Sequence, residues 1–289
     1  MSDIPTLGII GGSGLYQIPG LQDIEERVIS TPFGEPSSRV VVGTLEGRRV
    51  AFLARHGIGH FITPTEVNYR ANIYALKSIG VERVVSVSAC GSLREDYAPG
   101  DIIVPDQLFD NTKDRKRSFF GEGFVGHIGV ADPYCNAFSG QIFKALKKAG
   151  AKARQGGAFI TIEGPRFSTR AESNVFRSWG MSIIGMTASP EAFLAKEAEL
   201  CYGVMAHVTD YDVWHMTEEP VSVEAIIRVM NQNTKTAQEA LRHLAADLDP
   251  KRDCECPTAV SAALITAPDK IPAETRQNLA LLVGKYLKS

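Results

Sequence analysis

Two aspartates, Asp210 and Asp212, stand where an apolar run from Cys201 to Ala206 gives way to polar residues. The run predicts a buried strand, and positions two apart in an extended chain point the same way. Such a carboxylate pair suits a ligand edge that offers both an N–H donor and a proton-accepting nitrogen, as adenine does. A polar loop held by an Asx turn is the simpler alternative, and the residues alone leave it open.

A glycine turn follows the first apolar segment, residues 7–11, and carries the hydroxyl of Ser13. The N–H groups of such a turn can form an anion-binding nest. The dinucleotide fingerprint is not met, because Gln17 stands where the third glycine belongs, and no Gly-Lys-Ser/Thr of a P-loop follows. A phosphate cradle and a plain tight turn both remain open.

A second candidate anion site is Arg55-His56, at the end of a predicted hairpin over residues 39–54. Arginine offers a planar fork of donors and histidine offers one more, which suits an oxyanion. His56 and His60 have the spacing of a zinc-binding helix. The glycines between them argue against a helix and no glutamate follows His56, so we expect no metal here.

These residues follow elements that alternate between strand and helix. Apolar patterns predict strands over residues 7–11, 39–45, 49–54, 81–87, 101–105, 159–162, 182–186 and 201–210, and helices over 66–80, 140–149, 170–176, 191–201, 221–246 and 273–287. Residues 109–132 lack a period and are expected to be a loop or an interface segment. The alternation predicts one domain over 1–289, an open and largely parallel α/β sheet whose ligands bind beyond the strands' carboxyl ends.

Composition excludes several classes of function. A net charge of −2 over 289 residues gives no bulk attraction to nucleic acid or an anionic membrane. No apolar run reaches the ~18 residues of a spanning helix, and the first residues lack a signal peptide's pattern. We therefore expect a cytoplasmic protein. The basic run 113–117 is interpreted as a solvated loop.

The five cysteines do not form the pattern of a disulfide framework. Cys254 and Cys256 are too close-set for a usual zinc half-site, and no second half-site is evident in the sequence. We expect reduced thiols and no metal.

Taken together, the turns resemble the trimeric purine nucleoside phosphorylase family and, within it, the S-methyl-5'-thioadenosine phosphorylase branch. The matching stretches occur in the family's order at residues 11–15, 31–34, 53–57, 68–72, 89–95, 99–101, 162–173, 185–191 and 209–212. They span residues 7–246, and the linker and helix of 247–289 lie outside the signature. The resemblance implies that family's open, twisted mixed sheet flanked by helices.

The resemblance also implies a reaction and a set of roles. Phosphate, a co-substrate, attacks C1' of methylthioadenosine and adenine leaves, with no cofactor. The implied phosphate site is Ser13, Arg55, His56, Ser88, Ala89 and Thr187. Met186 is expected beneath the ribose and Phe167 on the purine. Asp210 is the implied general acid at N7, Asp212 the acceptor for the 6-amino group, and Tyr211 a packing residue between them.

Three positions separate the branches. In 6-oxopurine members, Phe167 is followed by glutamate and asparagine occupies the position of Asp210, whereas this chain has Ser168 and Asp210. Val223, with Ile226 one turn on, stands where the family's 5'-hydroxyl partner is histidine, which favours a methylthio group. The alternatives are a phosphorylase for methylthioinosine or adenosine, and a non-catalytic nucleoside-binding protein.

The family assembles as trimers, and some relatives as hexamers with disulfides and a CxC near the C-terminus. The resemblance therefore implies a homo-oligomer in which His127 reaches a neighbouring subunit's site.

Overall fold

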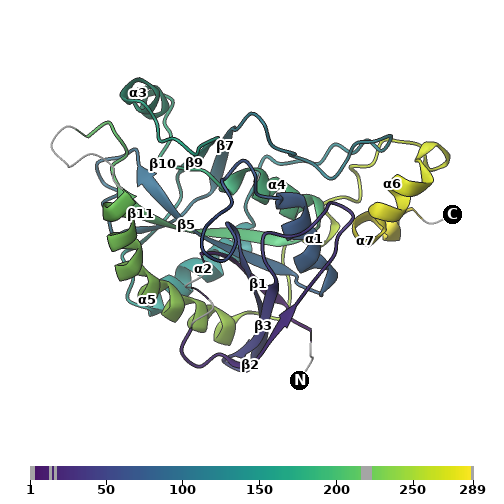
Figure 1. The fold of residues 1–289 in the computed structure, drawn as a ribbon, viewed down its shortest axis with the longest axis horizontal. Coiled ribbons are helices and arrows are strands. Elements are labelled where there is room, and N and C mark those ends of the chain that lie inside the picture. The colour runs from purple at the N-terminus through teal and green to yellow at the C-terminus, as the bar shows by residue number, and fades with distance from the viewer. Residues whose placement is uncertain (1–3, 13–14, 16–17, 216–222, 288–289) are drawn as a thin grey trace.

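An 11-stranded mixed sheet forms the centre of the molecule, with helices on both faces (Figure 1). The computed structural model describes residues 4–12, 15, 18–215 and 223–287, with the side chains of α5 described from residue 233 onward. This sheet flanked by helices confirms the predicted α/β class. Among the described residues, no helix combines the length and the apolar character needed to cross a membrane.

Strand β5 (Arg83–Ser92) is the spine of the sheet. On one side it pairs in parallel with β11 (Cys201–Asp210) along nearly its whole length. On the other it pairs first in parallel with β1 (Leu7–Gly11) and then antiparallel with β10 (Ile183–Gly185). Because β10 takes over where β1 ends, it runs antiparallel beside the carboxyl-terminal residues of β5, which also pair with the carboxyl end of β11.

The remaining strands extend the sheet in both directions. Beyond β1 lie β4 (Arg48–Ala54), β3 (Val40–Leu45) and β2 (Gln22–Arg27). Beyond β10 lie β9 (Ala158–Ile162) and β7 (Gln107–Asn111), and beyond β11 lie β6 (Ile102–Val104) and β8 (Ala153–Gln155). The sheet is more mixed than the apolar pattern predicts, because four of its strand pairs are antiparallel: β2–β3, β3–β4, β5–β10 and β6–β11.

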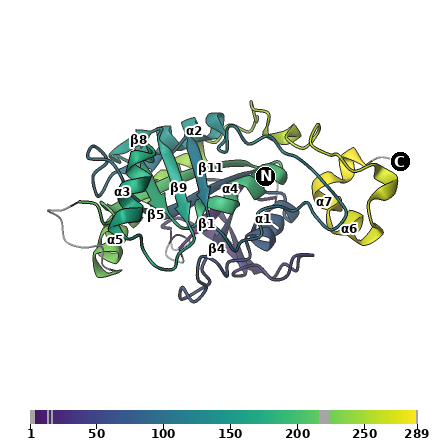
Figure 2. The same ribbon diagram turned by 90° about the horizontal axis from the view of Figure 1, so that it is seen from above.

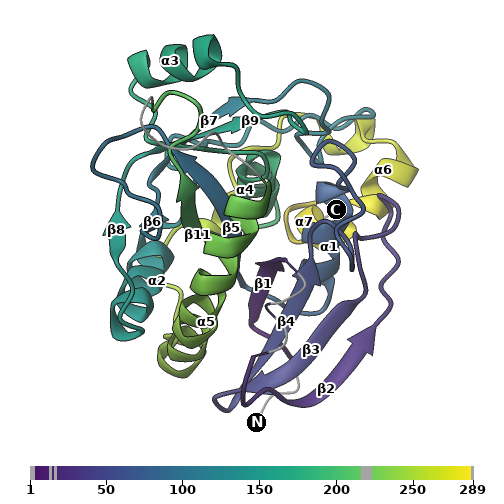
Figure 3. The same ribbon diagram turned by 60° about the vertical axis from the view of Figure 1, so that its left-hand side comes forward.

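Two pairs of helices cover the two faces of the sheet. Helices α2 (Asn136–Lys148) and α5 (Val223–Asp247) pack together against one face, and α1 (Tyr69–Ser78) and α4 (Ala188–Glu197) against the other. Helix α3 (Arg170–Ser178) stands off the edge of the sheet (Figure 3). A capping box starts it, in which the Thr169 hydroxyl accepts from the N–H of Glu172 and the Glu172 carboxylate accepts from the N–H of Thr169.

The C-terminal segment lies at the opposite end of the molecule from α3 (Figure 2). It forms α6 (Ala273–Asn278) and α7 (Ala280–Val283) with short 3-10 turns at Cys256–Thr258, Pro268–Lys270 and Gly284–Tyr286. The single helix predicted for 273–287 is wrong, because the chain leaves helical geometry at Leu279. The break buries Leu279, Leu282 and Val283 in the core on the α1 and α4 side.

Other predicted boundaries also fail for physical reasons. The helix predicted over 191–201 ends at Glu197, because Glu199 adopts a φ of 56° and Cys201 begins β11. The strand predicted over 81–87 is longer than its apolar run, since β5 continues through the small residues 88–91 to Ser92. Strands β2, β7 and β8 are absent from the prediction: β2 is charged and exposed, β7 lies partly in the predicted loop, and β8 has three residues.

Candidate active site

Asp210 ends β11 opposite Gly91 of β5, where a bulge between Val208 and Asp210 shifts the register. Its Oδ2 accepts from the Thr209 hydroxyl at 2.7 Å and its Oδ1 from the N–H of Asp212 at 2.8 Å. A Cβ at Gly91 would lie 2.9 Å from Oδ1 of Asp210. Glycine at 91 therefore makes the room that this carboxyl group occupies.

The bond from the Asp212 N–H to Asp210 is an Asx turn, so the simpler alternative for this stretch is present. The expectation that the two aspartates share one face of an extended strand is wrong. The strand ends at Asp210, and Asp212 adopts a φ of 51° beyond it. Their carboxyl groups are instead brought near each other by the turn.

Buried hydroxyl and carboxylate oxygens gather beside Asp212. Oδ2 of Asp212, Oγ of Ser168 and Oγ of Ser173 are buried without a hydrogen-bond partner among the described residues. The two serine hydroxyls nevertheless lie close enough to the Asp212 carboxyl group to lower its pKa through weak hydrogen bonds, so the three atoms are poorly satisfied rather than isolated. An unpaired buried polar atom costs about 1–3 kcal/mol, so this group of atoms is suited to a polar ligand.

Both aspartates are shifted toward their protonated forms. Burial raises the pKa of Asp210, and the Asp212 carboxylate adds to the rise, against the hydrogen bonds from Thr209 and from the Asp212 N–H. Burial likewise raises the pKa of Asp212. A carboxyl group with a raised pKa can hold a proton to donate at higher pH than an exposed aspartate.

Arg55 follows β4 and is buried with Glu191 of α4. Its Nε and Nη2 donate to the two Glu191 oxygens at 2.8 and 3.0 Å, and Nη2 also donates to Oγ of Ser86 at 2.6 Å. Part of the donor fork is therefore engaged within the protein, and the role of Arg55 at an oxyanion stays a prediction. Nη1, whose contact is a long 3.4 Å bond to the Val87 carbonyl, remains the guanidinium atom best placed for another acceptor.

His56 is shifted toward its neutral form. Burial first, and then the charge of Arg55, lower the pKa of His56 to about 4. Its Nδ1 lies 2.8 Å from the Ile62 carbonyl, which only accepts, so Nδ1 carries the proton. In this neutral tautomer Nε2 is an acceptor, and the predicted role of His56 at an oxyanion stays a prediction.

The other predicted phosphate residues lie at or near the edge where β5, β10 and β11 meet. Ser88 and Ala89 are inside β5, and Oγ of Ser88 is buried with no hydrogen-bond partner in the described chain. Thr187 is buried at the N-cap of α4, directly after β10. Ser13 lies outside the described residues, as do the side chains of Val223 and Ile226 in the first turn of α5.

The residues expected around the sugar and base occupy the same edge. Met186 follows β10, and a Cβ at Gly164 would meet its Sδ at 2.6 Å. Phe167 is 41% exposed. Tyr211 packs on His215, with ring centroids 4.7 Å apart.

A model of the phosphorylase superfamily matches residues 6–246. The S-methyl-5'-thioadenosine phosphorylase of Geobacter sulfurreducens is 52% identical over 282 residues, covering 97% of this chain and 99% of that protein. The chain belongs to the phosphorylase superfamily. The resemblance predicted from the sequence is thereby confirmed for the superfamily and for its methylthioadenosine branch.

Solved phosphorylase structures share the fold. A methylthioadenosine phosphorylase from an Antarctic soil metagenomic library has a TM-score of 0.92 at 44% identity, covering 97% of this chain and 99% of that one. The Schistosoma mansoni methylthioadenosine phosphorylase, solved in complex with adenine, has a TM-score of 0.79 at 33% identity. The match covers 97% of this chain and 98% of that one. The sheet of this chain is therefore a phosphorylase sheet.

One residue of this phosphorylase site was missed by the sequence analysis. Arg115, in the basic run interpreted as a solvated loop, has a side chain only 1% exposed. Its guanidinium donates to the carbonyls of Glu163 at 2.6 Å, Met186 at 2.6 Å and Ser189 at 2.8 Å. It therefore fixes the loop after β9 to the loop after β10.

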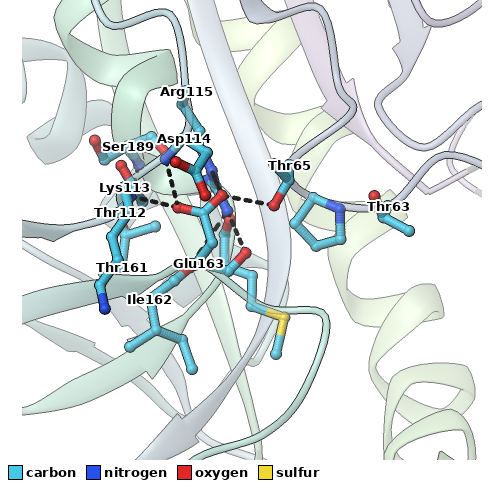
Figure 4. Close-up of polar contacts among 12 residues, drawn as sticks. Thr63, Thr65, Thr112, Lys113, Asp114, Arg115, Thr161, Ile162, Glu163 and Ser189 are labelled. Carbon is cyan, nitrogen blue, oxygen red and sulfur yellow. Dashed lines mark hydrogen bonds and ion pairs between the residues drawn. The ribbon is translucent and has the colours of Figure 1, made fainter.

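The Glu163 carboxylate accepts hydrogen bonds from two further segments of the same network (Figure 4). It accepts from the Thr65 hydroxyl at 2.6 Å, from the N–H groups of Lys113 and Asp114, and from Nε of Arg115 at 3.3 Å. Although partial burial opposes it, the hydrogen bond from Thr65 leads the contacts that lower the pKa of Glu163 to about 2. The network holds the loop that carries Phe167 and Ser168.

His127 does not join this site within the described chain. It is exposed, and its N–H donates to the Ala263 carbonyl at 2.8 Å in a loop that pairs with the C-terminal segment. That segment lies away from α3 (Figure 1).

Proposed function

We propose that this chain cleaves S-methyl-5'-thioadenosine with inorganic phosphate to adenine and 5-methylthioribose 1-phosphate, reversibly. The observation that carries the proposal is the pair of buried carboxyl groups of Asp210 and Asp212 at the end of β11, with the buried hydroxyls of Ser168 and Ser173 beside Asp212. A 6-aminopurine offers the donors that such oxygens lack. The confirmed family supplies the reaction class.

At the base, Asp210 is the general acid. Without a proton on N7 the purine departs as an anion, which is a poor leaving group. A carboxyl group with a raised pKa at N7 can donate that proton and so lower the barrier to cleavage of the glycosidic bond. Asp212 accepts from the 6-amino group, Phe167 stacks on the ring, and Tyr211 packs in the same turn. Ser168 leaves space and a hydroxyl where a glutamate would favour a 6-oxopurine.

At the sugar, the phosphate is the nucleophile. Arg55, held by Glu191, presents Nη1 as its charged donor, and the hydroxyls of Ser13, Ser88 and Thr187 with the N–H of Ala89 complete the phosphate site. An oxocarbenium-like transition state is stabilised by an anion fixed beneath C1'.

His56 and Met186 have accompanying roles. The lone pair on Nε2 of His56 accepts the P–OH hydrogen of the phosphate, since Nδ1–H is engaged by Ile62. Met186 packs beneath the ribose, and Val223 with Ile226 receives the methylthio group. No cofactor or metal takes part in this reaction.

We propose that the enzyme works in the cytoplasm, in purine and methionine salvage, as a homotrimer or homohexamer. His127 then serves the site of a neighbouring subunit, which is consistent with its exposure in this chain.

Release of adenine, followed by ultraviolet absorbance, tests the proposal. With methylthioadenosine we expect turnover only when phosphate is present, and a kcat/KM well above those for inosine, adenosine and methylthioinosine. A preference for inosine or methylthioinosine contradicts the substrate assignment, and binding without any phosphate-dependent release identifies a non-catalytic binding protein. The Val223→His variant should have a higher kcat/KM for nucleosides that carry a 5'-hydroxyl group, by a factor corresponding to ~1–3 kcal/mol.

A further inference from the structure

Four of the five cysteines meet at one place, although they come from three parts of the chain. The sulfur atoms of Cys135, Cys201, Cys254 and Cys256 all lie within 4.8 Å of one another. Sγ of Cys201 and Sγ of Cys254 are 3.4 Å apart. The sequence expectation that Cys254 and Cys256 lack a second pair of ligands is therefore wrong.

Three of the four sulfurs are carried by residues in regular elements with defined backbone hydrogen bonds. Cys135 is the N-cap of α2, and its N–H donates to the Tyr202 carbonyl at 2.9 Å. Cys201 begins β11, and its N–H donates to the Glu82 carbonyl at 3.0 Å. Cys256 begins a 3-10 turn in which its carbonyl accepts from Ala259. The four thiols converge because these elements are in place.

The separations suit one ion bound by all four sulfurs. Zn–S bonds of ~2.3 Å in a tetrahedron place the sulfurs about 3.8 Å apart, which the observed distances bracket. A disulfide needs a separation of about 2.05 Å, and all the cysteines here are free. The cluster packs against the apolar core between α2 and α5, and a set of soft thiolates selects zinc over magnesium or calcium.

We propose that Cys135, Cys201, Cys254 and Cys256 bind one zinc ion in a closed, four-thiolate structural site. Binding replaces four S–H bonds with four Zn–S bonds and releases four protons, which leaves a complex with a charge of −2. The N-terminal end of α2, where Cys135 is the cap, favours that negative charge.

The position of the zinc site gives it a structural role. Cys201 and Asp210 lie at opposite ends of β11, nine residue steps apart, which is about 30 Å. Residues 249–251 are already held to the sheet by the Arg83 guanidinium, which donates to the carbonyls of Asp249 and Lys251 at 2.6 and 2.9 Å. Zinc would fasten the following turn to α2 and β11.

Metal analysis of the full-length protein, purified under reducing conditions and reconstituted with Zn²⁺, tests the site. We expect one zinc per chain, and the intense visible absorption of tetrahedral cobalt thiolate when Co²⁺ replaces it. Cys254→Ser and Cys256→Ser should lose the metal. Glu255→Gln, an exposed neighbour in the same turn, should keep it.

Stability and activity give an independent readout. Removal of zinc by a chelator should lower the Tm by roughly 5 °C or more, while adenine release at 25 °C stays the same. Zinc content far below one per chain after reconstitution, or equal content in wild type and the cysteine variants, would overturn the proposal. Stable disulfides would also overturn the proposal. They would appear as a mass lower by two hydrogens for each disulfide in protein isolated without reductant, together with no metal uptake after reduction.

Discussion

The two ends of β11 differ in chemistry although one strand carries both. At its carboxyl end, Asp210 and Asp212 sit among buried and poorly satisfied oxygens, and burial raises the pKa of both. At its amino end, Cys201 meets three other thiols in an apolar setting. Unpaired polar atoms cost stability, so the first end is arranged for a ligand. The second end is arranged to hold the chain together.

The largest expected effect is a loss of kcat from a substitution at the carboxyl end of β11. Asp210→Asn should lower kcat for methylthioadenosine about 100- to 10,000-fold, because the leaving base loses its proton donor. The free energy of unfolding should not fall, since the asparagine never has to ionise in a buried place. Steady-state kinetics and denaturant unfolding on the same samples measure both, and turnover equal to wild type would remove Asp210 from the mechanism.

The support beneath the phosphate site gives the next effect. Glu191→Ala leaves the Arg55 guanidinium buried without its carboxylate, which should cost about 3–5 kcal/mol of unfolding free energy. Asp96→Ala, which breaks the exposed pair with Arg94, is the matched control and should cost at most about 1 kcal/mol. Equal losses for the two variants would contradict a special role for the buried pair.

A smaller effect concerns base discrimination. Asp212→Asn should lower kcat/KM for methylthioadenosine relative to methylthioinosine by a factor corresponding to ~1–3 kcal/mol, since an amide can donate to a 6-oxo group. Competition between the two nucleosides measures the ratio directly. A ratio unchanged from wild type would mean that Asp212 does not face the 6-position.

The smallest effect belongs to the amino end of β11. Cys254→Ser should lower the Tm by roughly 5 °C and leave kcat unchanged. Thermal unfolding and adenine release separate these quantities. A loss of activity without a loss of Tm would show that the two ends are not independent.

Sequence reasoning found the site residues that stand in short linear motifs at strand ends. Asp210 and Arg55 follow apolar runs, and parallel strands bring such ends together. It missed Arg115, because the carbonyls that bury it belong to residues 48 to 74 positions away.

The same limit applies to conformation and to clusters. The extended pair at Asp210 and Asp212 was a false prediction because Asp212 adopts a positive φ, which aspartate tolerates better than most residues but which only the turn requires. Cys135 and Cys201 gave no sequence signal of their closeness to Cys254 and Cys256, since the α2 and β11 backbones bring them there.

The pH dependence of kcat tests the central claim most directly. A carboxyl group whose pKa is raised keeps its proton to higher pH, so the donor is present below that pKa and is lost as pH rises through it. Saturating methylthioadenosine and phosphate should therefore give a kcat that falls on the alkaline side in wild type. This alkaline decrease, or limb, should be absent from the pH dependence of the residual kcat of Asp210→Asn. An identical limb in both proteins would contradict proton donation by Asp210.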